Sequence, residues 1–296
     1  MIAVVGAGAV GSYFGGMLAR AGHPVTLIGR ASHVEAVNAN GLRLESVSWD
    51  ETIPLRASTQ LSDVRGASVV LVCVKTVDTA YVARTIAPSL RQGTLVVSLQ
   101  NGVENVAVMR AEGVDGAVPA VVYVAVEVIA PGHVRHTGRG DLLVQNAHGV
   151  FEFAALCEGS GVPCRVVDDL GPDLWMKLAM NCAFNAVSAL GDVQYGAIAA
   201  NDAARETVAR AVEEAQAVAR AAGIRLPEPD LVPAAWKLAA AMPQATSSTA
   251  QDLARGRKTE IDALNGYVAR RGRELGVPTP VNQALTALVH LREATR

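Results

Sequence analysis

Short apolar runs alternate with helix-like segments along the N-terminal third of the chain. The runs contain almost no polar residues, which is typical of strands that are buried on both faces of a sheet. Strands are expected at residues 2–5, 25–28, 69–74 and 94–99. Helices are predicted at residues 10–21 and 78–87, the second of which ends before Pro88. This alternation predicts βαβ units, and therefore an α/β fold with a doubly wound, mostly parallel sheet.

The pattern changes twice further along the chain. A β-rich stretch follows, and it predicts an antiparallel extension of the sheet, with strands at residues 120–129, 134–136 and 142–144. Turns are expected at Pro131-Gly132 and at residues 138–140. The remainder has helical periodicity, with helices expected at residues 172–190, 202–222, 230–241 and 260–275. We therefore expect two domains, residues 1–168 with the sheet and residues 169–296 with helices alone.

Composition narrows the choice of partner and location. Lys plus Arg (26) nearly balance Asp plus Glu (28), so neither nucleic acid nor an anionic membrane surface is expected to bind. The longest apolar run, residues 117–126, is shorter than the roughly 18 residues of a spanning helix. No basic region precedes the apolar start, so no signal peptide is expected and a cytoplasmic location is favoured. The four cysteines lack CxxC spacing, which indicates buried, reduced thiols rather than disulfides. A homodimer is compatible with the sequence.

A glycine-rich motif of the form GxGxxG follows the first predicted strand and opens the first predicted helix. Its residues are Gly6, Ala7, Gly8, Ala9, Val10 and Gly11. In this context, backbone N–H groups and the helix N-terminus can bind a pyrophosphate, with Gly6 in the tight turn, Gly8 beside the phosphates and Gly11 between helix and strand. The alternative is a tight turn that binds no nucleotide.

The residue that ends the second strand indicates which dinucleotide is bound. A site for NAD usually has Asp or Glu there, to bind the ribose 2′-hydroxyl, whereas this chain has Arg30. A guanidinium can pair with a 2′-phosphate, so NADP(H) is favoured as the cofactor. The alternative is an ordinary solvated arginine.

Polar residues follow two of the other predicted strands. Lys75 and the pair Gln100-Asn101 fall at carboxyl ends of parallel strands, which face the ligand crevice in an open α/β sheet. A solvated loop lysine and an asparagine that merely precedes a glycine in a turn are the alternatives.

A second polar group lies on the helix predicted at residues 172–190. Lys177, Asn181 and Asn185 are spaced four residues apart, so they share one face of a helix whose other positions are mostly apolar. Buried amine and amide groups need partners, which a ligand with hydroxyl, carbonyl and carboxylate groups would supply. Hydrogen bonds between packed helices are the alternative.

A third group consists of Ser248, Asp252 and Glu260, and Glu260 is expected to open a helix, where it could be merely a favourable N-terminal carboxylate.

No metal is expected. His133 and His136 lie three apart in a β-rich stretch, so their side chains should leave opposite faces of the strand.

Taken together, these motifs resemble those of the ketopantoate reductase family. The resemblance rests on GAGAVG at 6–11, VKT at 74–76, QNG at 100–102, WMKLAMN at 175–181 with Asn185, and SSTAQD followed by KTEIDALNG. It implies a Rossmann-type N-terminal domain, a helical substrate and catalytic domain, and a cleft between them. It further implies NADPH-dependent reduction of a small branched 2-keto acid, above all 2-dehydropantoate to pantoate in pantothenate biosynthesis.

The resemblance also implies roles for single residues. Lys177 would be the general acid, while Glu260 would contact the substrate and hold the active-site network. The substrate's carboxylate and hydroxyl would be oriented by Asn101, Asn181, Asn185 and Ser248. Lys75 would lie beside the cofactor, and Asn101 is expected to contact it too. Residues 191–196 depart from the family pattern, which puts the identity of the keto acid in doubt.

Two other functions compete with this one. The first is an oxidoreductase of the 3-hydroxy acid dehydrogenase or imine reductase type, which shares the order of a Rossmann domain and a helical domain. The spacing of residues 175–185 and the late TEID segment favour ketopantoate reductase. The second is a non-catalytic NADP-binding module, against which the presence of Lys177 and Glu260 argues.

Overall fold

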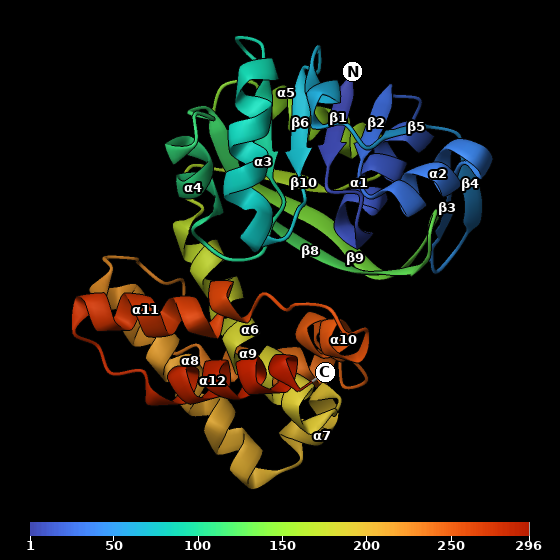
Figure 1. The fold of residues 1–296 in the computed structure, drawn as a ribbon. Coiled ribbons are helices and arrows are strands. Elements are labelled where there is room, and N and C mark those ends of the chain that lie inside the picture. Colours follow the sequence, from blue (N-terminus) through green and yellow to red (C-terminus); the bar gives the residue numbers. More distant parts are fainter. Residues whose placement is uncertain (296) are drawn as a thin grey trace. The chain divides into compact units, whose positions relative to one another are not determined.

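A computed structural model describes residues 1–295 and divides the chain into two compact units, Met1–Leu170 and a second unit that begins at Gly171. The first unit contains every strand of the described residues, and the second contains helices alone (Figure 1). Within residues 1–295, no helix has both the length and the apolar character needed to cross a membrane.

The first unit is built on one ten-stranded sheet. Its central part is parallel, in the order β5 (Arg56–Ser58), β2 (Val25–Ile28), β1 (Ile2–Val5), β6 (Val69–Val72), β7 (Leu95–Ser98) and β8 (Ala117–Ala130). The strand order reverses at β1, where the chain moves outward first to one side and then to the other. The doubly wound, mostly parallel sheet predicted from the apolar runs is therefore confirmed.

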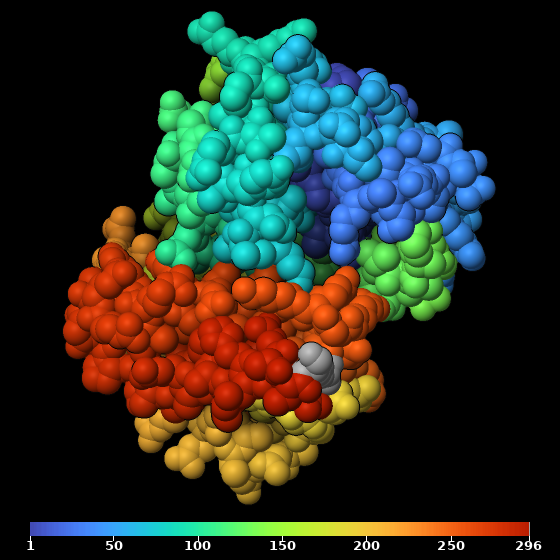
Figure 2. Space-filling view, viewed as in Figure 1, coloured from blue at the N-terminus to red at the C-terminus, as the bar shows by residue number. Residues whose placement is uncertain are grey.

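Both faces of this sheet are buried, because successive side chains of a strand point to opposite faces. Ile2 and Val4 of β1 belong to a core with α1 (Ala9–Arg20) and α5 (Val150–Gly159). Ala3 and Val5 belong to another core, with α3 (Thr79–Ile86) and α4 (Asn105–Ala111). The outward side of α3 lies at the surface of this unit (Figure 2). Tyr81 of this helix is exposed.

The extension beyond β8 differs in one respect from its prediction. Residues 134–136 and 142–144 are not separate strands but parts of one strand, β9 (His133–Gln145), which pairs antiparallel with β8. The glycines at 138 and 140 were expected to make a turn, and instead the register of the ladder shifts between Tyr123 and Val124 and again between Ala125 and Val126. Arg139 and Gly140 take left-handed backbone angles (φ 55° and 137°), so the extra residues bend the strand without ending it.

Short elements complete the first unit. Strand β9 pairs in parallel with β3 (Leu42–Glu45) and β10 (Cys164–Val167), and β3 pairs antiparallel with β4 (Asp50–Ile53). Helix α2 (Ala31–Asn40) joins β2 to β3, and its Val34 and Val37 pack in the same core as α1.

The second unit is organised around α6 (Gly171–Gly191), which contacts most of the other helices. These are α7 (Tyr195–Ala199), α8 (Asp202–Ala221), α9 (Val232–Ala241), α10 (Ser248–Ala254), α11 (Asn265–Leu275) and α12 (Pro280–Ala294). A helix was expected at residues 260–275, and the prediction of its first residue was wrong. Residues Ile261–Ala263 form a 3₁₀ turn, η4, and Leu264 (φ −111°, ψ −106°) breaks the backbone before α11 begins.

Candidate active site

The glycine loop joins β1 to α1 and leaves open space at only one of its three glycines. Gly6 has φ 102°, and a Cβ there would lie 2.6 Å from the carbonyl carbon of Cys73. A Cβ on Gly11 would lie 2.2 Å from the carbonyl oxygen of Gly6. A Cβ on Gly8 would meet no atom within 4 Å. The first and last glycines are therefore needed by the fold, whereas the middle one borders open space.

The residues of this loop fit a dinucleotide pyrophosphate. Gly8 is the N-cap of α1, no side chain caps the helix, and its first turn holds no acidic residue. The N-terminus of a helix carries partial positive charge and unsatisfied N–H groups, which together favour a phosphate. Residues 6–11 would thus hold the cofactor phosphates.

Arg30 lies next to this loop and is exposed. Its neighbour Gly29 donates from its amide to Ser58 (3.0 Å), and a Cβ on Gly29 would be 2.7 Å from the Cβ of Ala7. Arg30 is the N-cap of α2, in extended conformation (φ −72°, ψ 148°). The chain therefore turns from β2 into α2 directly beside the glycine loop, where a 2′-phosphate would need a cation.

Hydrogen bonds hold together the loops that follow β6 and β7. The hydroxyl of Thr76 and the carboxamide of Asn105 both donate to the main-chain oxygen of Asn101, at 3.2 and 2.7 Å. The carboxamide of Gln100, which is buried, donates to the main-chain oxygen of Val74 at 3.0 Å. Lys75 and Asn101 are thereby held at adjacent carboxyl ends of the parallel strands, as their positions in the sequence predict.

Further hydrogen bonds around Gln100 were not foreseen from sequence. Its carboxamide also donates to the Thr79 hydroxyl (2.7 Å), which in turn donates to the carboxamide oxygen of Asn105 (3.0 Å). The Gln-Asn-Gly run was a signal for Gln100, whereas Thr79 and Asn105 could be identified only from the fold.

In the second unit, the predicted polar face of α6 contains an asparagine pair without hydrogen-bonded side chains. Asn185 is 4% exposed and Asn181 is half-buried, on the same helix as Lys177. Within residues 1–295, neither carboxamide forms a hydrogen bond. Hydrogen bonding between packed helices therefore does not account for the two amides.

Helix α10 is attached to α6 beside this face. The Ser247 hydroxyl donates to the main-chain oxygen of Asn185 (3.0 Å), and the Ser247 amide donates to the hydroxyl of Ser188 (3.3 Å). Ser247 is also the N-cap of α10, because its hydroxyl accepts the amide of Ala250. Ser248, the first residue of that helix, is exposed and lies next to the turn of α6 that carries Asn185. Sequence reasoning missed Ser247, although serine directly before a helix is a known N-cap signal.

Glu260 does not open an α-helix as expected, but precedes the 3₁₀ turn η4 and is half-buried. The next residue, Ile261, packs in a core with Ala186 of α6, so the glutamate is anchored near α6 through its neighbour. Asp252, 8% exposed, forms an ion pair with Arg257 at 3.2 Å. Asp252 therefore has a structural partner within its own unit.

The histidines of the β-rich stretch contact neighbouring side chains of the first unit. No cluster of three or more His, Cys, Asp or Glu residues suited to a metal occurs among residues 1–295. His133 contacts Glu45 (3.1 Å), while His136 contacts Ser46 (3.0 Å) and stacks on Tyr13. Burial raises the pKa of the Cys182 thiol above its ordinary value, which keeps it protonated.

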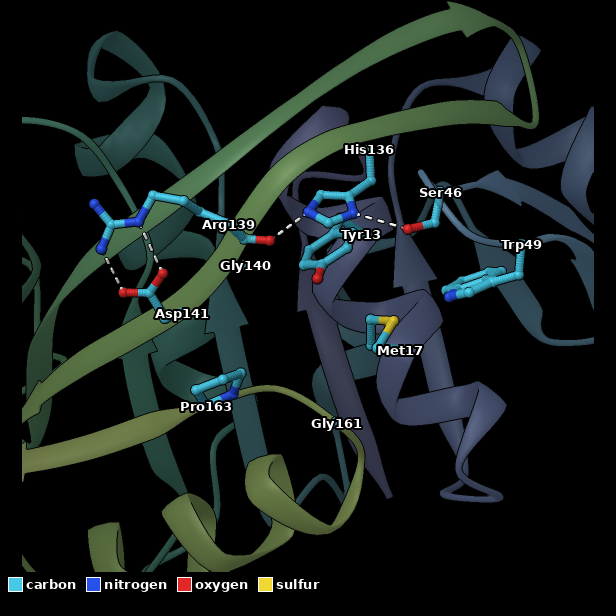
Figure 3. Close-up of a pocket in the computed structure, with 10 residues that line it drawn as sticks. All are labelled: Tyr13, Met17, Ser46, Trp49, His136, Arg139, Gly140, Asp141, Gly161 and Pro163. Carbon is cyan, nitrogen blue, oxygen red and sulfur yellow. Dashed lines mark hydrogen bonds and ion pairs between the residues drawn. The ribbon is translucent and has the colours of Figure 1, made fainter. Parts of the chain in front are cut away.

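A pocket of about 370 Å³ lies elsewhere in the first unit, between α1, β9 and the segment before β4 (Figure 3). Aromatic side chains of Tyr13, Trp49 and His136 form much of its wall, and none of the predicted site residues lines it. No residue of the glycine loop, Gly6 to Gly11, lines this pocket.

Comparison with known proteins decides the family. Residues 2–149 match the family described as "Ketopantoate reductase PanE/ApbA", and residues 169–293 match the family of its C-terminal part. The chain belongs to the ketopantoate reductase family. It is 36% identical to a 2-dehydropantoate 2-reductase of Pyrobaculum aerophilum, over 99% of this chain and 98% of the relative.

Solved structures agree with this assignment. A PanE/ApbA family ketopantoate reductase from Ralstonia eutropha is 47% identical and superposes with a TM-score of 0.95, covering 100% of this chain and 99% of that one. A D-mandelate dehydrogenase, solved with NADH and anilino(oxo)acetate, is 26% identical with a TM-score of 0.92, over 100% and 99% of the two chains. This ketopantoate reductase family member is thus an oxidoreductase with an α/β unit followed by a helical unit.

Proposed function

We propose that this enzyme reduces a small branched 2-keto acid with NADPH, and that 2-dehydropantoate is its substrate. The observation that carries the proposal is the polar face of α6, where Lys177 shares a face with two asparagines whose carboxamides form no hydrogen bond within residues 1–295. Polar groups that are largely buried require partners, and a 2-keto acid offers carbonyl and carboxylate oxygens for amide and ammonium donors.

The chemical step assigns one task to each group. When bound, the nicotinamide supplies the hydride that adds to the C2 carbonyl carbon. As the carbonyl oxygen gains negative charge, the Lys177 ammonium donates a proton to it, which yields the 2-hydroxyl. Asn181, Asn185 and Ser248 hold the substrate's oxygens. Glu260, Asn101 and Lys75 complete the proposed site, with Glu260 toward the substrate and Lys75 toward the cofactor.

The preference for NADPH rests on Arg30. The D-mandelate dehydrogenase that this chain resembles was solved with NADH, so a protein of this fold can bind NADH, and the proposed preference for NADPH depends on local charge. A guanidinium attracts the 2′-phosphate that NADH lacks, and no acidic residue lies in the first turn of α2 to oppose it.

We also propose that the enzyme is cytoplasmic, a location in which its four cysteines would stay reduced. A homodimer stays a prediction, which the molecular mass in solution tests.

The decisive experiment measures oxidation of NADPH and NADH with a panel of keto acids. The panel contains ketopantoate, 2-ketoisovalerate and, because of the similarity to D-mandelate dehydrogenase, benzoylformate. We expect the highest kcat/KM for ketopantoate with NADPH. A higher kcat/KM for benzoylformate would move the substrate to the aryl class, and binding of NADPH without turnover on any keto acid would indicate a non-catalytic module.

The proposed preference for NADPH over NADH is tested separately by the Arg30→Asp variant. Its carboxylate should repel the 2′-phosphate and accept the ribose hydroxyl of NADH, so the preference should shift toward NADH. Wild-type protein that binds NADH as tightly as NADPH in calorimetric titration would contradict the assignment of Arg30.

A further inference from the structure

A buried histidine connects the two helices whose N-termini face the proposed cofactor site. His33 lies in the first turn of α2 and is 7% exposed. Its Nε2 is 3.1 Å from the hydroxyl of Ser12, and its Nδ1 is 3.1 Å from the backbone amide of Gly132. Ser12 is fully buried in α1, directly after Gly11. One imidazole thus contacts α1, α2 and the turn between β8 and β9.

These contacts fix the protonation state of the ring. The amide of Gly132 can only donate, so Nδ1 must be the unprotonated acceptor. Nε2 then carries the proton and donates it to the Ser12 hydroxyl. A neutral ring in this single tautomer satisfies both neighbours, while a protonated ring would set two N–H groups against each other at Gly132.

His33 is also tied to Arg30 through the backbone. The amides of His33 and Val34 both donate to the main-chain oxygen of Arg30, at 3.1 Å each. Arg30 therefore sits one helical turn from the imidazole, on a helix whose first turn is hydrogen-bonded to α1. The pyrophosphate and the 2′-phosphate belong to one cofactor molecule. The distance between the glycine loop and Arg30, the two groups proposed to bind them, must therefore stay constant.

We propose that His33, through its hydrogen bond to Ser12, positions Arg30 relative to the glycine loop and thereby sets the preference for NADPH over NADH. This inference rests on the proposed function in one respect, the role of Arg30 at the 2′-phosphate. His33 touches neither cofactor nor substrate, and acts as a positioning residue. Loosening α2 should weaken only the contact that NADPH makes and NADH does not.

The experiment compares dissociation constants for NADPH and NADH by calorimetric titration, which requires no substrate. Ser12→Ala removes the acceptor of the histidine proton. His33→Asn keeps an oxygen near the position of Nδ1, toward Gly132, but does not reach Ser12. Both variants should lower the NADPH preference by about fivefold or more, as expected for one lost hydrogen bond, with NADH affinity within about twofold of wild type.

Conservative rescue and a matched control separate positioning from stability. His33→Gln places an amide N–H near the position of Nε2, so it should retain most of the preference. Asn38, near the other end of α2, exchanges two hydrogen bonds of 2.9 Å with the backbone of Ala57. Asn38→Ala should lower the melting temperature and leave the ratio of the two dissociation constants unchanged.

Two results would overturn the inference. The first is Ser12→Ala and His33→Asn proteins that are less stable, like Asn38→Ala, yet discriminate between the cofactors as wild type does. Ser12→Ala deletes a single hydroxyl and serves as the test if His33→Asn fails to fold. The second is wild-type protein without NADPH preference, which also removes the assignment of Arg30, whereas failure on every keto acid would refute only the proposed reaction.

Discussion

Gly11 and Gly6 lie so close that a Cβ on Gly11 would sit 2.2 Å from the carbonyl oxygen of Gly6. That oxygen belongs to backbone, which cannot move aside as the end of a flexible side chain would. Gly8, between them, borders open space and has φ −86°, an angle that any residue adopts. Gly11 is therefore needed for the packing of α1 on β1, whereas Gly8 borders space that the phosphates of the proposed cofactor would occupy.

Substitution by alanine should separate these two reasons. Gly11→Ala should destabilise the fold by about 1–3 kcal/mol or more, because the methyl group overpacks the turn. Gly8→Ala should leave stability within about 1 kcal/mol and weaken NADPH binding at least tenfold, because the methyl group would occupy the phosphates' approach. Thermal unfolding and calorimetric titration measure both effects. A Gly8→Ala protein with wild-type NADPH affinity would remove the pyrophosphate from this loop.

Asn181 should matter for the substrate and little for stability. Asn181→Ala should raise KM for the best keto acid by about fivefold, as for a lost hydrogen bond, with NADPH affinity unchanged. Asn265→Ala is the matched control, because the Asn265 carboxamide donates to the main-chain oxygen of Cys182 (3.1 Å) and to the side chain of Asn282 (3.0 Å). That variant should lose about 1–3 kcal/mol of stability. Unchanged KM together with a comparable loss of stability in Asn181→Ala would support a packing role.

Strands buried on both faces could be predicted from sequence because nearly every residue of such a strand is apolar. The long strand β9 could not, since the glycines at 138 and 140 match a turn as well as a bulge, and only pairing with β8 decides between them. The predicted start of the helix that became α11 was wrong for a related reason. Ile261, Leu264 and Val268 have helical spacing, yet the backbone breaks at Leu264 while all three remain buried.

In the candidate site, too, features formed by residues close in the sequence could be predicted, whereas contacts between distant residues could not. The glycine loop and the asparagines of α6 could be predicted because each depends on a few neighbouring residues and one element. The bond between Ser12 and His33 spans 21 positions, and the bond between Ser247 and Asn185 spans 62. Neither follows from any spacing rule, because each depends on how two helices pack.

Gly140 should tolerate no side chain, because of Tyr13. A Cβ there would lie 2.2 Å from the Tyr13 hydroxyl, and φ is 137°. Gly140→Ala should therefore cost about 2 kcal/mol or more, combining backbone strain with overpacking beside the pocket of Figure 3. Gly138 is the control, since a Cβ on it would meet nothing within 4 Å. Equal unfolding midpoints in urea for the two alanine variants would contradict this account of the bulge.

His33 should make stability depend on pH. Burial, and then the charge of Arg30, lower its pKa below the ordinary value of 6.5, so the native protein binds fewer protons here than the unfolded chain. The stabilisation is complete above about pH 6.5 and is lost as the pH falls below it, by at most about 1.4 kcal/mol per pH unit. Urea unfolding across this range should show a steeper loss for wild type than for His33→Gln. Parallel curves would mean that His33 titrates alike in both states.

Lys177 is the residue on which the proposed chemistry depends most. Lys177→Ala removes the proton donor and the positive charge beside the developing alkoxide, and loss of a positioned proton donor typically costs about 100- to 10,000-fold in rate. NADPH affinity should change little, because the residues proposed to bind its phosphates, the glycine loop and Arg30, belong to the first unit. Stability should also change little, because Lys177 is only half-buried.

A second lysine of the same unit provides the comparison for Lys177. Lys237 is exposed on α9, so Lys237→Ala removes an equal charge and should leave kcat unchanged. If Lys177→Ala folds, binds NADPH and turns over its best keto acid within about threefold of wild type, it falls far outside the range for a lost acid. The proton donor would then have to be sought at Lys75, which lies in the first unit at the carboxyl end of β6.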